Sequence, residues 1–175
     1  MKSINLVDEP IIDLLKKIAI PASTGTLFQT LYNIVDTFFA GKISPNALAA
    51  IAKSFPLYFI IIATGVGIVS ASNALISNSL GAKENRTASL YIAQSLLYSI
   101  IVSIIVTIVG LLISDDLLRF MGSDQKTINL ATDYLDIIFF GTIIFLIQIS
   151  LNGALNAQGD TKSYRNVLIF SFFLN

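Results

Sequence analysis

Residues 88–113 read ASLYIAQSLLYSIIVSIIVTIVGLLI and contain no Asp, Glu, Lys or Arg. A helix needs about 20 such residues to cross the hydrocarbon core of a bilayer, which is about 30 Å thick. A strand would leave backbone groups without hydrogen bonds in lipid, so a spanning segment of this kind has to be helical. The stretch therefore predicts a transmembrane helix.

Similar apolar segments lie on both sides of this stretch. They cover about residues 14–41, 48–80, 130–157 and 167–175. Short polar breaks at residues 41–46, 81–86, 115–126 and 158–162 separate the segments. We expect an all-α, polytopic transmembrane helix bundle with four full spans. The fifth segment is still apolar at Asn175, and we expect it to be the start of a further span in an incomplete lobe, that is, a fragment.

The composition agrees with a membrane protein and excludes several functions. The 175 residues are 54% hydrophobic and 13% charged, whereas soluble domains carry about 25% charged residues. A net charge of zero gives no reason to expect a nucleic-acid partner. The absence of Cys and His removes disulfides, thiol catalysis and the commonest zinc ligands. No HExxH, GxSxG or Walker lysine motif is present, so we expect neither an enzyme nor a cofactor.

The loops indicate an orientation. Lys and Arg residues are more frequent in cytoplasmic loops than in external ones. With the N-terminus inside, the cytoplasmic side holds Lys2, Lys16, Lys17, Lys83, Arg86, Lys162 and Arg165, and the outer side holds Lys42, Arg119 and Lys126. The charge bias therefore predicts a cytoplasmic N-terminus. The start of the chain lacks the pattern of a cleaved signal peptide, and we expect it to be retained.

The first segment carries an unusual polar face. On a helix, the following side chains fall within an arc of about 120°: Thr26, Gln29, Thr30, Asn33, Asp36 and Thr37. Lipid does not tolerate such a stripe, so it is expected to face protein or a wet cavity. Asp36 is the candidate functional acid, and Gln29, Thr30, Asn33 and Thr37 are candidate cavity residues. The alternative is that Asp36 lies near the helix end and meets the membrane interface.

Other segments contain polar or small residues at helical spacing. Gln148, Asn152 and Asn156 follow one another every four residues in the fourth segment, and they either line the cavity or bond between helices. Ala63, Gly67 and Ala71 form a small-residue stripe in the second segment that permits close helix packing. Pro21 removes a backbone hydrogen bond from the first segment and is a candidate kink or hinge.

Several stretches together resemble the multidrug and toxic compound extrusion (MATE) transporters. They are residues 18–21 (IAIP), 35–41 (VDTFFAG), 47–50 (ALAA), 65–67 (GVG), 75–77 (LIS), 80–83 (LGAK), 121–123 (MGS), 134–135 (YL) and 153–162 (GALNAQGDTK). Their order and spacing extend over nearly the whole chain. The resemblance implies a twelve-helix antiporter with two six-helix lobes, of which this chain would be most of the N-terminal one.

The resemblance also implies a function and a set of residues. A proton or sodium ion would drive the export of small organic cations or amphiphilic drugs across the plasma membrane. Asp36 and Asn175 match positions of the family's cation site, and Asp36 would be the sodium ligand if sodium is the coupling ion. Neutralising Asp36 would change the packing of the first helix near Pro21, and the C-terminal lobe would be a missing partner.

Two other functions stay open. A lipid-linked saccharide flippase has a related architecture, but basic residues that could hold pyrophosphate are expected inside its spans. The only candidate here is Lys53. The other alternative is a truncated membrane fragment or accessory subunit that transports nothing, because alternating access needs a second lobe.

Overall fold

The computed structural model describes residues 10–174, which form five helices and no strand. The helices are α1 (Ile11–Ile43), α2 (Pro45–Gly81), α3 (Asn85–Phe120), α4 (Gln125–Ala157) and α5 (Lys162–Leu174). The all-α bundle predicted from the sequence is confirmed. Asn175, predicted to belong to a cation site, lies outside the described residues.

Polar residues in the connections set where the helices begin. Ser44 lies between α1 and α2, and its Oγ accepts a hydrogen bond from the Ala47 N–H at 3.0 Å. Pro45 follows as the first residue of α2, where its missing N–H costs nothing. Asp124 caps α4 in the same way through the Thr127 N–H. These caps hold the connections to a few residues, so successive helices run antiparallel.

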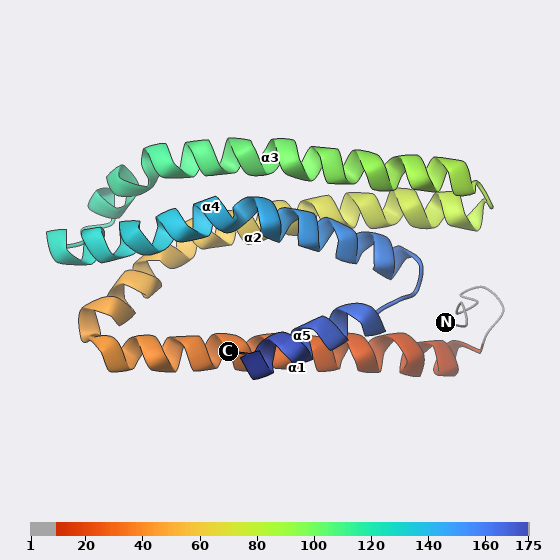
Figure 1. The fold of residues 1–175 in the computed structure, drawn as a ribbon, viewed down its shortest axis with the longest axis horizontal. Coiled ribbons are helices and arrows are strands. Elements are labelled where there is room, and N and C mark those ends of the chain that lie inside the picture. Colours follow the sequence, from red (N-terminus) through yellow and green to blue (C-terminus); the bar gives the residue numbers. More distant parts are fainter. Residues whose placement is uncertain (1–9, 175) are drawn as a thin grey trace.

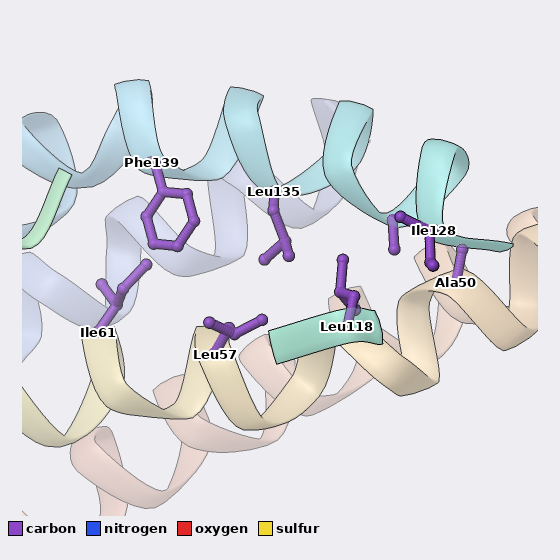
Figure 2. Packing of buried hydrophobic residues seen from close by; sticks show 8 residues of the cluster. Ala50, Leu57, Ile61, Leu118, Ile128, Leu135 and Phe139 are labelled. Atoms are coloured by element: carbon purple, nitrogen blue, oxygen red, sulfur yellow. The ribbon is translucent and has the colours of Figure 1, made fainter. Parts of the chain in front are cut away.

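Helices α2, α3 and α4 pack side by side as one bundle (Figure 1). Their shared hydrophobic core includes Leu57 and Ile61 from α2, Leu118 from α3, and Leu135 and Phe139 from α4 (Figure 2). All five side chains are at most 4% exposed. This closely packed bundle forms the side of the molecule against which α1 and α5 are placed.

Helix α3 contacts its neighbours through small residues. Its buried positions in the middle of the helix are Ser95, Ser99, Ser103 and Gly110. Large side chains such as Ile104 and Ile108 are instead about half exposed, at 49% and 53%. Lipid is as apolar as these side chains, so close backbone approach rather than hydrophobic burial holds such helices together. The Ser95 and Ser150 hydroxyls also bond to each other, from α3 to α4, at 3.1 Å.

Helices α1 and α5 form a separate pair on one side of the bundle (Figure 1). The Phe28 and Phe172 rings meet edge to face, with centroids 5.4 Å apart. Gly25 of α1 leaves room for α5, because a Cβ there would lie 3.4 Å from the Arg165 Cα. The pair therefore depends on a close backbone approach that only a small residue at position 25 permits.

Three of the described helices, α2, α3 and α4, are long and apolar enough to cross a membrane. The sequence predicted a fourth full span in the first segment. Helix α1 has the length, since its 33 residues equal those of α4. It differs in composition, because the polar stripe and the pair Lys16–Lys17 make it less apolar than the others. The starts of α1, α3 and α5 lie toward the same end of the molecule (Figure 1).

Asp160 begins α5 and gives a testable prediction. Its carboxylate accepts hydrogen bonds from the N–H groups of Lys162 and Ser163 and from the Ser163 hydroxyl. The Ser163 hydroxyl bond above all, then the backbone bonds, hold the pKa of Asp160 below its ordinary value. Asp160→Ala is therefore expected to cost about 1 kcal/mol of α5 stability, as for other N-caps. Amide hydrogen exchange across residues 162–166 measures this loss.

The pH dependence has a definite sign. The pKa of Asp160 is lower in the folded than in the unfolded protein, so its ionised carboxylate stabilises the folded state at pH values above the unfolded pKa of about 3.9. This stabilisation is lost as the pH falls through the folded-state pKa. Wild-type protection at α5 should therefore fall toward that of Asp160→Ala at acidic pH. Asp116→Ala, at an exposed acid of α3, is the matched control and should leave α5 unchanged. Equal protection in all three proteins would show that the cap contributes nothing.

Candidate functional site

A cavity of about 580 Å³ lies where α1, α2 and α4 come together. We call it the Asp36 cavity. Its lining is Tyr32, Asn33, Asp36, Thr37, Phe39, Ala40 and Ile43 from α1, Ile51, Ser54, Phe55 and Tyr58 from α2, and Tyr134 and Ile138 from α4. Its size falls within the 300–1,000 Å³ typical of small-molecule sites. Most of the lining is apolar or aromatic, with a few polar groups and one acid.

Asp36 is the only acid in this lining. It lies seven positions before the last residue of α1, roughly 10 Å along the helix axis. Asn33 and Thr37 come from the same face of α1 and line the same cavity. The cavity therefore gives the predicted acid a shared polar environment, formed by three helices rather than by α1 alone.

The threonines of the polar stripe bond mainly to their own helix. The Thr37 hydroxyl donates to the Asn33 carbonyl at 2.8 Å, and the Thr30 hydroxyl donates to the Thr26 carbonyl at 3.0 Å. Such bonds satisfy the hydroxyl proton inside the helix. What these threonines still offer a ligand is acceptor capacity. The threonine hydroxyls are therefore not available as hydrogen-bond donors to a ligand. The polar stripe thus offers a ligand fewer donors than the sequence indicated.

Aromatic side chains form much of the wall around Asp36. Tyr32, Tyr58 and Tyr134 approach from three different helices, and Phe39 and Phe55 complete the set. Aromatic faces attract organic cations, by about 0.5–2 kcal/mol for each well-placed ring. An acid surrounded by such rings is a suitable arrangement for a cation, whether a small ion or an organic one.

A second cavity, of about 720 Å³, lies on another side of α1. Thr30, Asn33 and Thr37 line it, so Asn33 and Thr37 border both cavities. The Lys42 ammonium lies 4.6 Å from the centre of the Phe38 ring at one end of this cavity. The predicted polar stripe is therefore divided between two cavities, and Gln29 lines neither of them.

The side-chain amides of α4 that the sequence indicated as cavity candidates do not line the Asp36 cavity. Neither Gln148 nor Asn152 lines the Asp36 cavity. Gln148 is exposed, and the buried Oδ1 atom of Asn152 has no hydrogen-bond partner. Their assignment to a cavity stays a prediction. Pro21 is buried within α1, which continues as a helix on both sides of it, and its role as a hinge likewise stays a prediction.

Sequence reasoning missed the role of Lys53. Its ammonium donates to the carbonyl of Met121, the C-cap residue of α3, at 2.8 Å. A cation at the C-terminal end of a helix is stabilised by the helix dipole. Lys53 therefore joins α2 to the connection between α3 and α4. This contact occupies the one basic residue considered for a pyrophosphate site.

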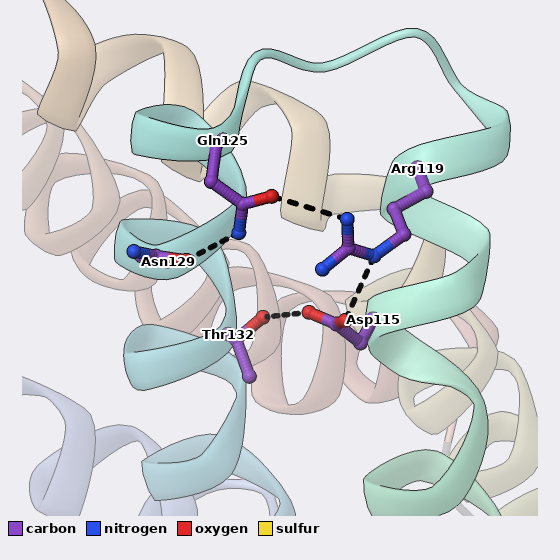
Figure 3. Close-up of polar contacts among 5 residues, drawn as sticks. All are labelled: Asp115, Arg119, Gln125, Asn129 and Thr132. Carbon is purple, nitrogen blue, oxygen red and sulfur yellow. Dashed lines mark hydrogen bonds and ion pairs between the residues drawn. The ribbon is translucent and has the colours of Figure 1, made fainter.

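A polar network continues along the same connection (Figure 3). Arg119 forms an ion pair with Asp115 at 3.0 Å and donates to Gln125 at 3.1 Å. Gln125 in turn donates to Asn129, and Thr132 donates to Asp115. The Arg119 and Asp115 side chains are about half exposed, at 52% and 47%, so the pair contributes little stability by itself. The bonds from Arg119 to Gln125 and from Thr132 to Asp115 are the ones that join the ends of α3 and α4.

The donor set bears on ion binding. Within residues 10–174, no group of three or more His, Cys, Asp or Glu residues could hold a metal ion. Within the Asp36 cavity, Asp36 is the one carboxylate offered to a cation, beside neutral oxygens such as those of Asn33 and Thr37. Such a site suits a proton or a weakly held monovalent ion better than a tightly bound divalent one.

Long apolar helices with an acid-containing cavity between them define a multi-pass membrane protein. The chain belongs to the MatE family, which matches residues 21–175. It is 26% identical to the probable multidrug resistance protein YoeA of Bacillus subtilis, over 89% of this chain and 34% of that protein. It is also 26% identical to the multidrug export protein MepA of Staphylococcus aureus strain MRSA252, over 95% of this chain and 40% of that protein.

Solved structures agree with this assignment. The outward-facing structure of a multidrug resistance MATE family transporter of the MOP superfamily matches with a TM-score of 0.92 and 28% identity. The match covers 99% of this chain and 39% of that one. The family predicted from the sequence is confirmed. The chain spans less than half the length of these relatives.

Proposed function

We propose that this chain supplies the cation-binding part of a secondary antiporter that exports organic cations or amphiphilic drugs. The observation that carries the proposal is Asp36, the single acid in a cavity walled by aromatic rings from three helices. One named relative is a probable multidrug resistance protein and the other is a multidrug export protein, which supports the substrate class. We further propose that the protein lies in the plasma membrane with a cytoplasmic N-terminus, and that the protein is not an enzyme.

The proposed mechanism uses the cost of a charge in the membrane. A carboxylate removed from water is destabilised, so binding of a proton or Na⁺ at Asp36 is favoured when the cavity closes. An organic cation would be attracted to the same carboxylate and to Tyr58 and Tyr134. Neutralising Asp36 weakens that attraction and releases the organic cation. Movement of α1 around Pro21 is the proposed link to opening and closing of the cavity.

The remaining helices are part of this proposal. The matched transporter is longer than this chain, which covers 39% of it. We propose that a C-terminal lobe, or protein that takes its place, completes the transport pathway. Export and binding therefore need separate experiments, because the lining of the Asp36 cavity comes from this chain while the rest of the pathway is proposed to come from the further lobe.

The prediction for Asp36→Asn is loss of coupling. Cells that produce the protein together with the proposed C-terminal lobe are loaded with ethidium, and efflux is followed by fluorescence with membrane levels matched by immunoblot. Wild type should export the dye, and Asp36→Asn should lose most of this export because an amide neither titrates nor carries charge. Asp133→Asn changes an exposed acid of α4 outside the cavity and should export like wild type. Equal export by Asp36→Asn would remove Asp36 from the mechanism.

A binding measurement tests the site without the rest of the pathway. The purified chain in nanodiscs is titrated with tetraphenylphosphonium at several pH values and sodium concentrations. Wild type should bind more weakly as protons or Na⁺ are added, and Asp36→Asn should bind weakly under all conditions. Binding that ignores both the substitution and the coupling ions would exclude a cation site at Asp36. Binding without export would place this chain with the non-transporting alternatives.

A further inference from the structure

Helix α2 is packed differently in its first part than in the rest. In residues 45–55 the buried side chains are the small ones of Ala50 and Ser54. The later part of the helix also buries large side chains, such as those of Leu57 and Ile61. A small side chain makes fewer dispersion contacts than a large one. We call residues 45–55 the α2 arm, and packing holds this arm to the bundle less firmly than it holds the rest of α2.

A proline separates the α2 arm from the rest of the helix. Pro56 lies inside α2 and has no N–H, so the carbonyl of Ala52 loses its helical hydrogen bond. Sharp bends in helices occur mainly where the hydrogen bonding is interrupted in this way. The first turns of α2 rise obliquely from the end of α1, and the later turns run along α4 (Figure 1). The arm therefore has a defined point about which to bend.

A polar contact fastens the α2 arm to the bundle. The Lys53 ammonium donates to the carbonyl of Met121, at the end of α3, at 2.8 Å. Lys53 lies eight positions after Pro45, the first residue of α2, which is roughly 12 Å along the helix. At this depth a released ammonium reaches water at the membrane surface by extending its long side chain. Breaking the contact therefore leaves no charge in hydrocarbon, so the contact is reversible.

The α2 arm and the rest of α2 contribute different walls to the Asp36 cavity. Ile51 and Phe55 come from the arm, whereas Tyr58 comes from beyond the proline. A single residue separates the arm from the end of α1, the helix that carries Asp36. Movement of the arm therefore also moves this end of α1. A bend at Pro56 changes the cavity from two walls at once and leaves α4 in place.

We propose that the α2 arm is a gate of the Asp36 cavity, which opens by bending at Pro56 and is held shut by the bond from Lys53 to Met121. The inference rests on the proposed function in one respect, since it takes the cavity as the site of a ligand. It adds the place where the ligand passes, which is the end of the molecule that holds the α1–α2 and α3–α4 connections. With the N-terminus in the cytoplasm, that end faces the outside.

A pair of reporter groups measures the position of the α2 arm. The chain contains no cysteine and no tryptophan, so one of each is introduced without background. Ala49→Cys, labelled with bimane, lies on the exposed side of the arm, and Lys126→Trp lies at the start of α4. The neighbouring residues Ala50 and Ile128 belong to one core cluster (Figure 2). Tryptophan quenches bimane only at close range, so opening of the arm should restore bimane fluorescence.

Lys53→Met in this reporter protein removes the bond and keeps most of the side-chain length. Loss of a hydrogen bond from a charged donor changes an equilibrium by about tenfold or more, so the ratio of open to shut protein should rise by about that factor. Lys42→Met is the matched control, because the Lys42 ammonium lies over the Phe38 ring of its own helix, and its quenching should match wild type. Equal quenching in wild type and Lys53→Met would overturn the proposal.

A second substitution tests the position of the bend. Pro56→Ala restores the hydrogen bond to the Ala52 carbonyl and so fixes the angle of the α2 arm. In this background, Lys53→Met should change the ratio of open to shut protein by less than about twofold, because the helix no longer bends there. Helical content, measured by circular dichroism, should be equal in all variants. A full effect of Lys53→Met in the Pro56→Ala background would show loosening without a hinge and would overturn the proposal.

Release of ligand tests the gate itself. Tetraphenylphosphonium should leave Lys53→Met about tenfold faster than wild type in nanodiscs, and unchanged release from an open arm would overturn its role as a gate. Asp36→Asn leaves the contact between Lys53 and Met121 in place and should keep wild-type quenching. Opening of the arm in Lys53→Met, together with no binding of tetraphenylphosphonium by wild type, would contradict the proposed function and leave the bending at Pro56 supported.

Discussion

Gly110→Ala is expected to lower the free energy of unfolding by about 1–3 kcal/mol, as overpacking of a close-packed interior does. A Cβ at this position of α3 would overlap the Phe139 ring of α4. The ring cannot move aside easily, because Phe139 is 2% exposed and belongs to the core of the bundle (Figure 2). Either α3 and α4 separate or Phe139 leaves its rotamer. The Thr107 hydroxyl, which donates to the Phe139 carbonyl at 2.7 Å, would be disturbed in the first case.

Reversible unfolding in mixed detergent micelles measures this effect. Gly141→Ala is the matched control, since a Cβ there would meet no atom within 4 Å. The control should be neutral or slightly stabilising, because alanine favours a helix over glycine by about 1 kcal/mol. Adding Phe139→Leu to Gly110→Ala should recover part of the loss. If both glycine variants unfold alike, the close contact between α3 and α4 does not limit stability.

Leu135→Ala is expected to cost about 2–5 kcal/mol, the range for truncating a fully buried leucine. Leu135 is 0% exposed and packs with Leu57, Leu118 and Phe139, so each of the three bundle helices loses contacts. Unfolding in a membrane does not transfer side chains to water, so the cost comes mainly from the cavity and lost dispersion. We therefore expect a value toward the lower end of the range.

Ile137→Ala on the same helix is the comparison for Leu135→Ala. Ile137 is 75% exposed, so its truncation should change the free energy of unfolding by less than about 0.5 kcal/mol. The same detergent titration serves for both variants. If Leu135→Ala and Ile137→Ala lower the free energy of unfolding by similar amounts, burial in the core of the bundle is not what stabilises α4.

The helical segments could be predicted because membrane helices are long and their apolar character is continuous. Residues 88–113 were enough to indicate the fold class, and α3 extends beyond them on both sides as Asn85–Phe120. The polar face of α1 could also be predicted, since a helix brings Asn33, Asp36 and Thr37 together by periodicity alone. These are properties of single helices, and a single sequence contains them.

Contacts between helices could not be predicted in the same way. Tyr58 and Tyr134 reach the Asp36 cavity from α2 and α4, and each is unremarkable within its own segment. Lys53 was identified as a basic residue in a span, but its partner is the carbonyl of Met121, far along the chain. The stripe of Ala63, Gly67 and Ala71 on α2 is a similar case, because its spacing was visible in the sequence while its exposure beside α3 was not.

The pairing of α1 with α5 has a consequence for synthesis of the protein. The Thr161 hydroxyl at the start of α5 donates to the Ile18 carbonyl of α1 at 3.4 Å, so α1 is completed by a helix that is synthesised more than a hundred residues later. At usual translation rates the interval between them is on the order of ten seconds. During that time α1, the least apolar of the long helices, lacks the contacts at Gly25 and Phe28 that α5 supplies. We therefore expect insertion factors and membrane proteases to reach α1 more readily during synthesis than in the folded protein.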